Sequence, residues 1–152
     1  MGMPKEPVLV WSNRQRAVSA RQLSLPVARV TVKTAFPLVR EARRRGSVLG
    51  ELDEIGIVLV SDGRIAALHD EFMSDPTPTD VITFLHGEIV ISAETARREA
   101  RRRKLPIPEE IARYAVHGLL HLAGWSDLDA TAAAKMRSVQ EKILRRALRN
   151  LC

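Results

Sequence analysis

Short apolar runs bounded by turn residues recur along the chain and predict strands. Residues 8–11 are apolar and precede polar residues, so we expect a strand that leads into a loop. Residues 55–60 form a continuous apolar run closed by serine, aspartate and glycine, which is typical of a buried strand followed by a turn. Residues 81–84 and 89–91 are two further runs separated by a turn at Gly87, and they predict a β-hairpin.

Elsewhere the apolar residues recur every three or four positions, as they do in amphipathic helices. Residues 37–45 are predicted to be helical, with Pro37 at an early helical position and Gly46 as the stop. The stretch 17–36 is ambiguous, because residues 30–34 alternate like a strand while the surrounding spacing also fits a helix.

Further helices are expected in the second half of the chain. Residues 65–72 have helical spacing, and Ser92 is predicted to cap a basic helix that runs to about Lys104. Residues 108–110, a proline and two glutamates, suit the start of a helix that carries two histidines. The last helix is expected from near 129 to 148. Its buried stripe is predicted to comprise Met136, Val139, Ile143 and Ala147.

Strands and helices alternate without strict βαβ regularity, and one pair of strands is adjacent in sequence. We therefore expect an α/β (α+β) fold, in which a small mixed β-sheet of about four strands packs against about five helices. A metal site is expected at the end of a central helix. The length of 152 residues suits a single domain over residues 1–152.

The metal-site prediction rests on residues 117–127. His117 and His121 are four residues apart, so they lie on one face of a helix. Gly124 falls where a helix ends with a left-handed residue, and the reversed chain could return Asp127 toward the imidazoles. Two imidazoles and a carboxylate suit zinc, and three protein ligands leave one position for water, as catalytic zinc sites require. The alternative is a pair of hydrogen-bonded core histidines.

Arginine supplies most of the positive charge of the chain, whose formal net charge is +6. Guanidinium groups suit bidentate phosphate contacts, so this balance favours a polyanionic partner. The alternative is that the arginines form solvated faces of amphipathic helices. The clusters are Arg40, Arg43, Arg44 and Arg45, then Arg97, Arg98, Arg101, Arg102 and Arg103, and finally Arg145, Arg146 and Arg149.

The sequence also favours a soluble cytoplasmic protein. Cys152 is the one cysteine, so we expect no disulfide within the chain and a reducing compartment. Residues 1–10 lack the long apolar core of a signal peptide, and the Ser or Thr of a myristoylation signal is missing after Gly2. No apolar run approaches membrane-spanning length.

Three segments of the chain resemble the YbeY family of bacterial endoribonucleases and ribosomal RNA maturation factors. Residues 117–127 resemble the family signature His-Gly-x-Leu-His-Leu-x-Gly-aromatic-x-His. Residues 78–84, Pro-Thr-Asp-Val-Ile-Thr-Phe, are similar to its Pro-Thr-Asp-Val-Leu-Ser-Phe segment, and residues 87–92 are similar to its Gly-Asp-Ile-Val-Ile-Ser strand. The segments follow the family's order and spacing, and the resemblance covers residues 50–148.

The resemblance implies a small metalloprotein that binds one zinc ion, with His117 and His121 as ligands and Asp127 at the place of the third. A metal-bound water would be the nucleophile at His117. The implied function is that of a zinc-dependent endoribonuclease for single-stranded RNA, which matures the 3′ end of the small-subunit ribosomal RNA and acts in ribosome quality control. The implied partners are ribosomal RNA and the ribosome or its small-subunit proteins.

Two positions depart from the family pattern. Asp127 replaces a histidine, and a charged ligand makes a zinc-bound water less acidic than three neutral ligands do. Met73 stands where the family has an arginine that is important for its activity, and methionine offers no cation to a phosphodiester in its transition state. Arg113, Arg64 and Arg97 are candidates to replace that arginine, or are exposed residues without a catalytic role.

Two other functions fit part of the pattern. A zinc peptidase also uses two histidines four apart and a carboxylate. Such enzymes place a glutamate directly after the first histidine as the general base, whereas this chain has Gly118 there. A non-catalytic ribosome-assembly protein would use the metal to hold the helix end and the arginines to bind RNA.

Overall fold

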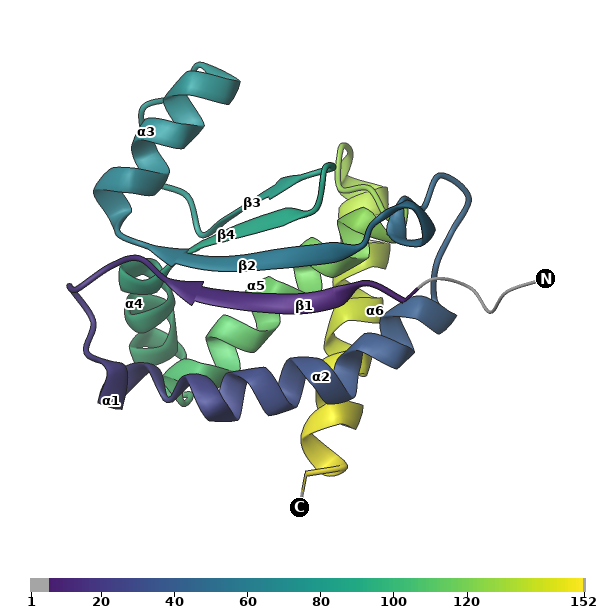
Figure 1. Cartoon of the computed structure of the whole chain (residues 1–152), viewed down its shortest axis with the longest axis horizontal. Coiled ribbons are helices and arrows are strands. Elements are labelled where there is room, and N and C mark those ends of the chain that lie inside the picture. The colour runs from purple at the N-terminus through teal and green to yellow at the C-terminus, as the bar shows by residue number, and fades with distance from the viewer. Residues whose placement is uncertain (1–5, 152) are drawn as a thin grey trace.

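The computed structural model describes residues 6–151 and shows a mixed four-stranded sheet with helices on both faces (Figure 1). The strands are β1 (Val8–Asn13), β2 (Glu54–Val60), β3 (Val81–Phe84) and β4 (Glu88–Ser92), in the order β1-β2-β4-β3. Strand β2 pairs in parallel with β1 and β4, whereas β3 pairs with β4 in the antiparallel direction. The predicted α+β fold and its four strands are confirmed.

The helices divide unequally between the two faces of the sheet. Helices α2, α4, α5 and α6 cover one face, and α3 stands on the other (Figure 1). Strand β2 supplies both cores, because successive side chains point to opposite faces: Ile57 and Leu59 belong to the larger core and Val58 to the smaller one under α3. The helices are α1 (Ala20–Leu23), α2 (Leu25–Glu41), α3 (Asp62–Met73), α4 (Ala93–Arg103), α5 (Ile107–Leu122) and α6 (Ala130–Arg149), with a 3-10 turn at Leu49–Glu51.

Helix α2 resolves the ambiguous stretch in favour of a helix. The prediction that Pro37 begins a helix is wrong, because Pro37 lies inside α2, which ends at Glu41. Both Pro37 and Lys33, four residues earlier, are exposed, so the carbonyl group that loses its intrahelical hydrogen bond at Pro37 belongs to an exposed residue. The proline therefore sits on the outer side of the helix, where water can replace the missing donor.

The hairpin of β3 and β4 has a three-residue connection that ends at Gly87. The Gly87 amide donates to the carbonyl of Phe84 at 2.9 Å, and Gly87 has φ +105°. This is the geometry of a type I turn followed by a glycine bulge. A Cβ atom at Gly87 would lie 2.9 Å from the Glu54 carbonyl oxygen, so strand β2 also requires glycine here.

Helix α5 is the central helix, and it packs against α2, α4, α6, β3 and β4. It approaches the sheet most closely at Gly118, where a Cβ atom would lie 2.7 Å from Cγ2 of Ile89 in β4. Helix α6 packs along α5 with a buried stripe that differs from the prediction. Gln140, which is 8% exposed, is buried in it, whereas Val139 is only partly buried.

None of the helices within residues 6–151 is long and apolar enough to cross a membrane. Cys152 and Gly2, on which the expectations about disulfides and N-terminal signals rest, lie outside the described residues.

Candidate metal centre

The end of helix α5 is shaped by Gly124. The Trp125 amide donates to the Leu120 carbonyl at 3.0 Å, and the Gly124 amide donates to the His121 carbonyl at 3.1 Å. With φ +98° at Gly124, this pair of hydrogen bonds forms a Schellman motif. The predicted left-handed helix end at Gly124 is confirmed. The motif reverses the chain, so that Asp127 comes back toward the last turn of α5.

The reversed chain brings three metal-binding side chains together. The Nε2 atoms of His117 and His121 are 3.1 Å apart. Oδ2 of Asp127 lies 3.5 Å from Nε2 of His117 and 3.4 Å from Nε2 of His121. One nitrogen of each ring and one carboxylate oxygen thus form a nearly equilateral triangle. The structure places all three predicted ligands in one cluster.

The hydrogen bonds of the two rings assign their tautomers. Nδ1 of His121 lies 3.1 Å from the Trp125 carbonyl oxygen, which can only accept, so this Nδ1 carries the proton. Nδ1 of His117 lies 2.8 Å from Oε1 of Gln140 and is likewise the donor. In the neutral rings both Nε2 atoms therefore present lone pairs to one another. Two facing lone pairs repel unless a proton or a cation lies between them, so the donor set fits a bound metal ion.

Burial keeps the first of these rings neutral. Burial is the largest influence on His117 and lowers its pKa below the ordinary value of 6.5, so the ring is uncharged at neutral pH. The side chains nevertheless retain a solvent-facing side, with exposures of 26% for His117, 23% for His121 and 42% for Asp127. The cluster is therefore open to solvent on one side rather than sealed in the core.

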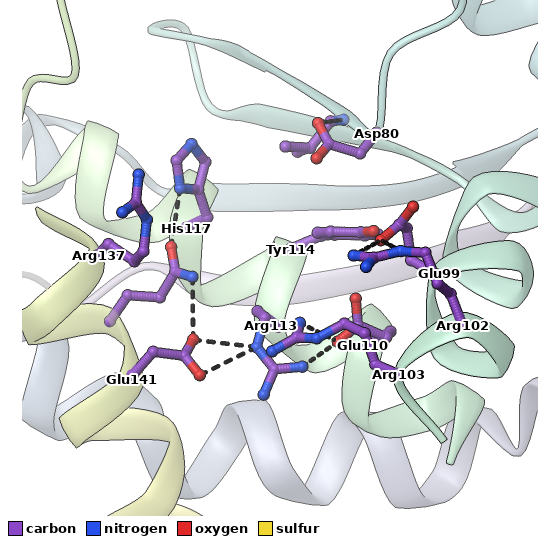
Figure 2. A pocket seen from close by; sticks show the side chains of 12 residues that line it. Asp80, Glu99, Arg102, Arg103, Glu110, Arg113, Tyr114, His117, Arg137 and Glu141 are labelled. Atoms are coloured by element: carbon purple, nitrogen blue, oxygen red, sulfur yellow. Dashed lines mark hydrogen bonds and ion pairs between the residues drawn. The ribbon is translucent and has the colours of Figure 1, made fainter. Parts of the chain in front are cut away.

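A chain of polar contacts behind His117 fixes its orientation (Figure 2). Nε2 of Gln140 donates to Glu141 at 3.2 Å, which directs the amide oxygen of Gln140 toward His117. Nε of Arg113 donates to the same Glu141 carboxylate at 3.0 Å. Sequence reasoning missed Gln140 and Glu141. The available signal was Gln140 itself, a polar residue four positions after Met136 on the apolar side of α6.

His121 is fixed by a different part of the chain. Its carbonyl partner belongs to Trp125, whose indole Nε1 donates to the Ala42 carbonyl at 3.0 Å. The Arg44 guanidinium lies 4.2 Å from the centre of the Trp125 ring, and the Arg44 amide donates to the Ala123 carbonyl at 2.8 Å. The segment that follows α2 thus holds the loop at the end of α5.

A cavity of about 510 Å³ opens beside all three predicted ligands. Met73, which is 54% exposed, lies at the end of α3 and lines this cavity together with Leu85 and Leu128. Thr83 also lines it, and its hydroxyl is the one buried side-chain polar atom within residues 6–151 without a hydrogen-bond partner. No lysine or arginine is among the described residues that line this cavity.

The three arginines considered as replacements at Met73 lie in different surroundings. Arg113 lines a second cavity that shares His117, but carboxylates of Glu109, Glu110 and Glu141 surround its guanidinium. Arg97 donates to the Ala17 carbonyl at 3.4 Å, and Arg64 lines a cavity on the α3 side of the sheet. Neither Arg97 nor Arg64 lines a cavity that contains a histidine of the cluster.

Comparison with known proteins places this fold and site in a family. The family model described as Endoribonuclease YbeY matches residues 17–148. The solution structure of TM1509 from Thermotoga maritima has the same fold, with a TM-score of 0.58 and 21% sequence identity over 95% of this chain and 91% of that one.

Curated relatives agree with the family model. The Endoribonuclease YbeY of Anaeromyxobacter sp. (strain Fw109-5) is 40% identical over 137 residues, which cover 78% of this chain and 71% of that protein. The Endoribonuclease YbeY of Moorella thermoacetica is 31% identical over 147 residues, or 84% of this chain and 94% of that protein. The matched residues include the histidine cluster, its loop and the helix behind it. The chain therefore belongs to the YbeY family of endoribonucleases.

Proposed function

We propose that this protein is a zinc-dependent endoribonuclease that cuts single-stranded RNA in the cytoplasm. Its proposed roles are the maturation of the 3′ end of the small-subunit ribosomal RNA and ribosome quality control. Its membership in a family of metal-dependent hydrolases of phosphodiester bonds supports the reaction class. The observation that carries the proposal is the triangle of His117, His121 and Asp127.

The donor set favours zinc over magnesium and calcium. Two imidazole nitrogens and one carboxylate oxygen are typical zinc ligands, whereas magnesium and calcium take oxygen ligands. The separations of 3.1, 3.4 and 3.5 Å between these three atoms are short enough for one ion to contact all of them. Three protein ligands and a solvent-facing side match a catalytic site rather than a closed structural one. His117, His121 and Asp127 would hold the ion, which would supply Lewis-acid stabilisation of a phosphoryl oxygen and activation of water.

The chain's own residues prepare the site for this chemistry. Gln140 and the Trp125 carbonyl hold the two rings with Nε2 toward the ligand position, so little reorganisation is needed when the ion and substrate bind. The cavity beside Asp127 gives an RNA strand access to the site. Basic helix α4 and the net charge of +6 supply attraction to the phosphate backbone, and ribosomal RNA and small-subunit proteins are the proposed partners.

The experiment is cleavage of a fluorescent single-stranded ribosomal RNA fragment, together with elemental analysis of the purified protein. We expect one zinc ion per chain, and we expect a chelator to abolish cleavage and added zinc to restore it. Cleavage that persists after the metal has been removed would refute the zinc mechanism. Casein digestion is the parallel assay for the peptidase alternative, and we expect none because Gly118 replaces the general base.

Asp127→Ala distinguishes the proposed enzyme from the alternative, a non-catalytic ribosome-assembly protein. The lack of cations beside Met73 is the observation that favours this alternative. If the metal is catalytic, the variant stays folded, still binds RNA and loses cleavage by about 100-fold, the upper end of the loss seen when a residue that merely supports a metal ligand is removed. If the metal is structural, folding and RNA binding are lost together. Asp70→Ala is the matched control, because Asp70 is an exposed carboxylate on α3 that lines neither cavity.

A further inference from the structure

The second cavity at His117 differs from the first in the side chains that surround it. It has a volume of about 490 Å³ and lies between α4, α5, α6 and the start of β3 (Figure 2). Where the first cavity has Met73, Leu85 and Leu128, this one is lined by four arginines. His117 is common to both cavities, so the two spaces meet at the metal cluster.

Three of these four arginines already have carboxylate partners. Arg102 pairs with Glu99 at 2.6 Å, and Arg103 pairs with the buried Glu110 at 2.9 Å. Arg113 is bonded to the Glu141 carboxylate and to Glu110. Each of these cations would have to leave an existing ion pair, or share it, before it could neutralise a phosphate.

Arg137 is the exception. It is exposed, and its guanidinium makes no ion pair or hydrogen bond within residues 6–151. Glu141, one turn later on the same face of α6, does not hold it, because Arg113 and Gln140 already bind that carboxylate. Arg137 is therefore the one unpaired cation among the described residues that line the two cavities at His117.

The position of Arg137 on α6 directs it toward the metal cluster. It lies one turn before Gln140, whose Oε1 is 2.8 Å from Nδ1 of His117. Helical side chains lean toward the N-terminus of their helix, and α6 begins at Ala130, three residues after Asp127. Figure 2 shows Arg137 and His117 at the same end of the cavity, with the guanidinium directed away from the Glu141 and Arg113 contacts.

We propose that Arg137 binds a phosphate of the RNA strand next to the one held at the metal cluster. Its planar guanidinium offers two parallel N–H donors to phosphate oxygens, and no carboxylate within residues 6–151 competes for them. The strand would then pass from the cavity beside Asp127, across His117, into the arginine-lined cavity. This inference rests on the proposed function, because it assumes that the substrate is RNA.

The test compares the binding of a fluorescent single-stranded oligoribonucleotide by metal-loaded wild type and variants, measured by anisotropy before detectable cleavage. For Arg137→Ala we expect the Kd to rise about tenfold, as for one charge-assisted contact near the surface. The slope of log affinity against log salt concentration should become shallower by about 0.7, which is the contribution of the counterions released when one phosphate of a single strand is neutralised. Arg137→Lys should keep the salt slope and lose only part of the affinity.

Arg149→Ala is the matched control, because Arg149 is an exposed arginine near the end of the same helix and lines neither cavity. It should bind RNA within about twofold of the wild type, and all variants should unfold at the wild-type denaturant concentration. If Arg137→Ala has the affinity and salt slope of Arg149→Ala, the inference is wrong while the proposed function stands. If the wild type neither binds nor cleaves the RNA, the proposed function fails and the inference fails with it.

Discussion

Gly118 sets the distance between the helix that carries the histidines and the sheet, and Gly118→Ala tests this contact. The added methyl carbon would lie 2.7, 2.8 and 2.9 Å from Cγ2, Cδ1 and Cγ1 of Ile89. Ile89 cannot turn away easily, since it is completely buried, β-branched and held in β4 between β2 and β3. The substitution must therefore push α5 off the sheet or distort Ile89.

Two opposing free energies decide the size of the effect. Replacing glycine by alanine inside a helix stabilises it by about 1 kcal/mol. Overpacking a buried site costs about 1–3 kcal/mol, and three contacts below 3.0 Å place Gly118 at the upper end. We expect the free energy of unfolding to fall by about 2 kcal/mol, which for a domain of this size lowers the Tm by about 4–8 °C.

The measurement is urea unfolding followed by circular dichroism, with Gly63→Ala as the control. Gly63 lies in the first turn of α3, where the nearest atom to an added Cβ is 3.9 Å away, so this variant should be as stable as the wild type or more so. Ile89→Ala should offset part of the Gly118→Ala cost, so that the double variant is about 2 kcal/mol more stable than the sum of the single effects predicts. A Gly118→Ala protein as stable as Gly63→Ala, or strictly additive effects, would refute the packing argument.

Two further predictions concern polar groups. Gln140→Leu removes the acceptor of the His117 Nδ1 proton, so we expect zinc affinity in a chelator-dye competition to fall about 10–100-fold. Equal affinity for Gln140→Leu and the wild type would contradict the orienting role. Burial raises the pKa of Asp62, but hydrogen bonds from Arg98 at 2.7 Å and from two hydroxyls outweigh it and hold the pKa below 3.8. Asp62→Asn should therefore lower the free energy of unfolding at pH 7 by about 1–3 kcal/mol, and the difference should shrink as the pH falls below 3.8 through the lower pKa of the folded state. A difference that stays constant down to about pH 3 in urea titrations would show that the Asp62 charge is not responsible.

The parts of the molecule that local sequence determines could be predicted. The strands are short apolar runs between turn residues, and the helix stop at Gly124 needs only a residue that accepts a positive φ. The candidate metal ligands were accessible for the same reason, because helical periodicity and one chain reversal within residues 117–127 place them together. No contact between distant elements was needed to see them.

The rest depends on packing between segments that are far apart in the chain. Gln140 meets His117 only because α6 lies along α5, and the two residues are 23 positions apart. The pairing of Arg103 with Glu110 and the isolation of Arg137 likewise follow from the way the helices meet. Pro37 was misplaced because a proline near the start of a helix and one on its solvent side have the same local signature.

The anchoring of Trp125 makes the candidate metal site sensitive to mutations far away in the sequence. The ring nitrogen of Trp125 is bound by Ala42, which precedes it by 83 positions, and the backbone oxygen of the same tryptophan orients His121. A backbone shift near Ala42 is therefore transmitted through Trp125 to the His121 imidazole, without any change at the three predicted metal ligands themselves. Damage to activity from a substitution near residues 42–48 is thus no sign that RNA contacts that surface, and metal affinity should be measured before such a surface is assigned to substrate binding.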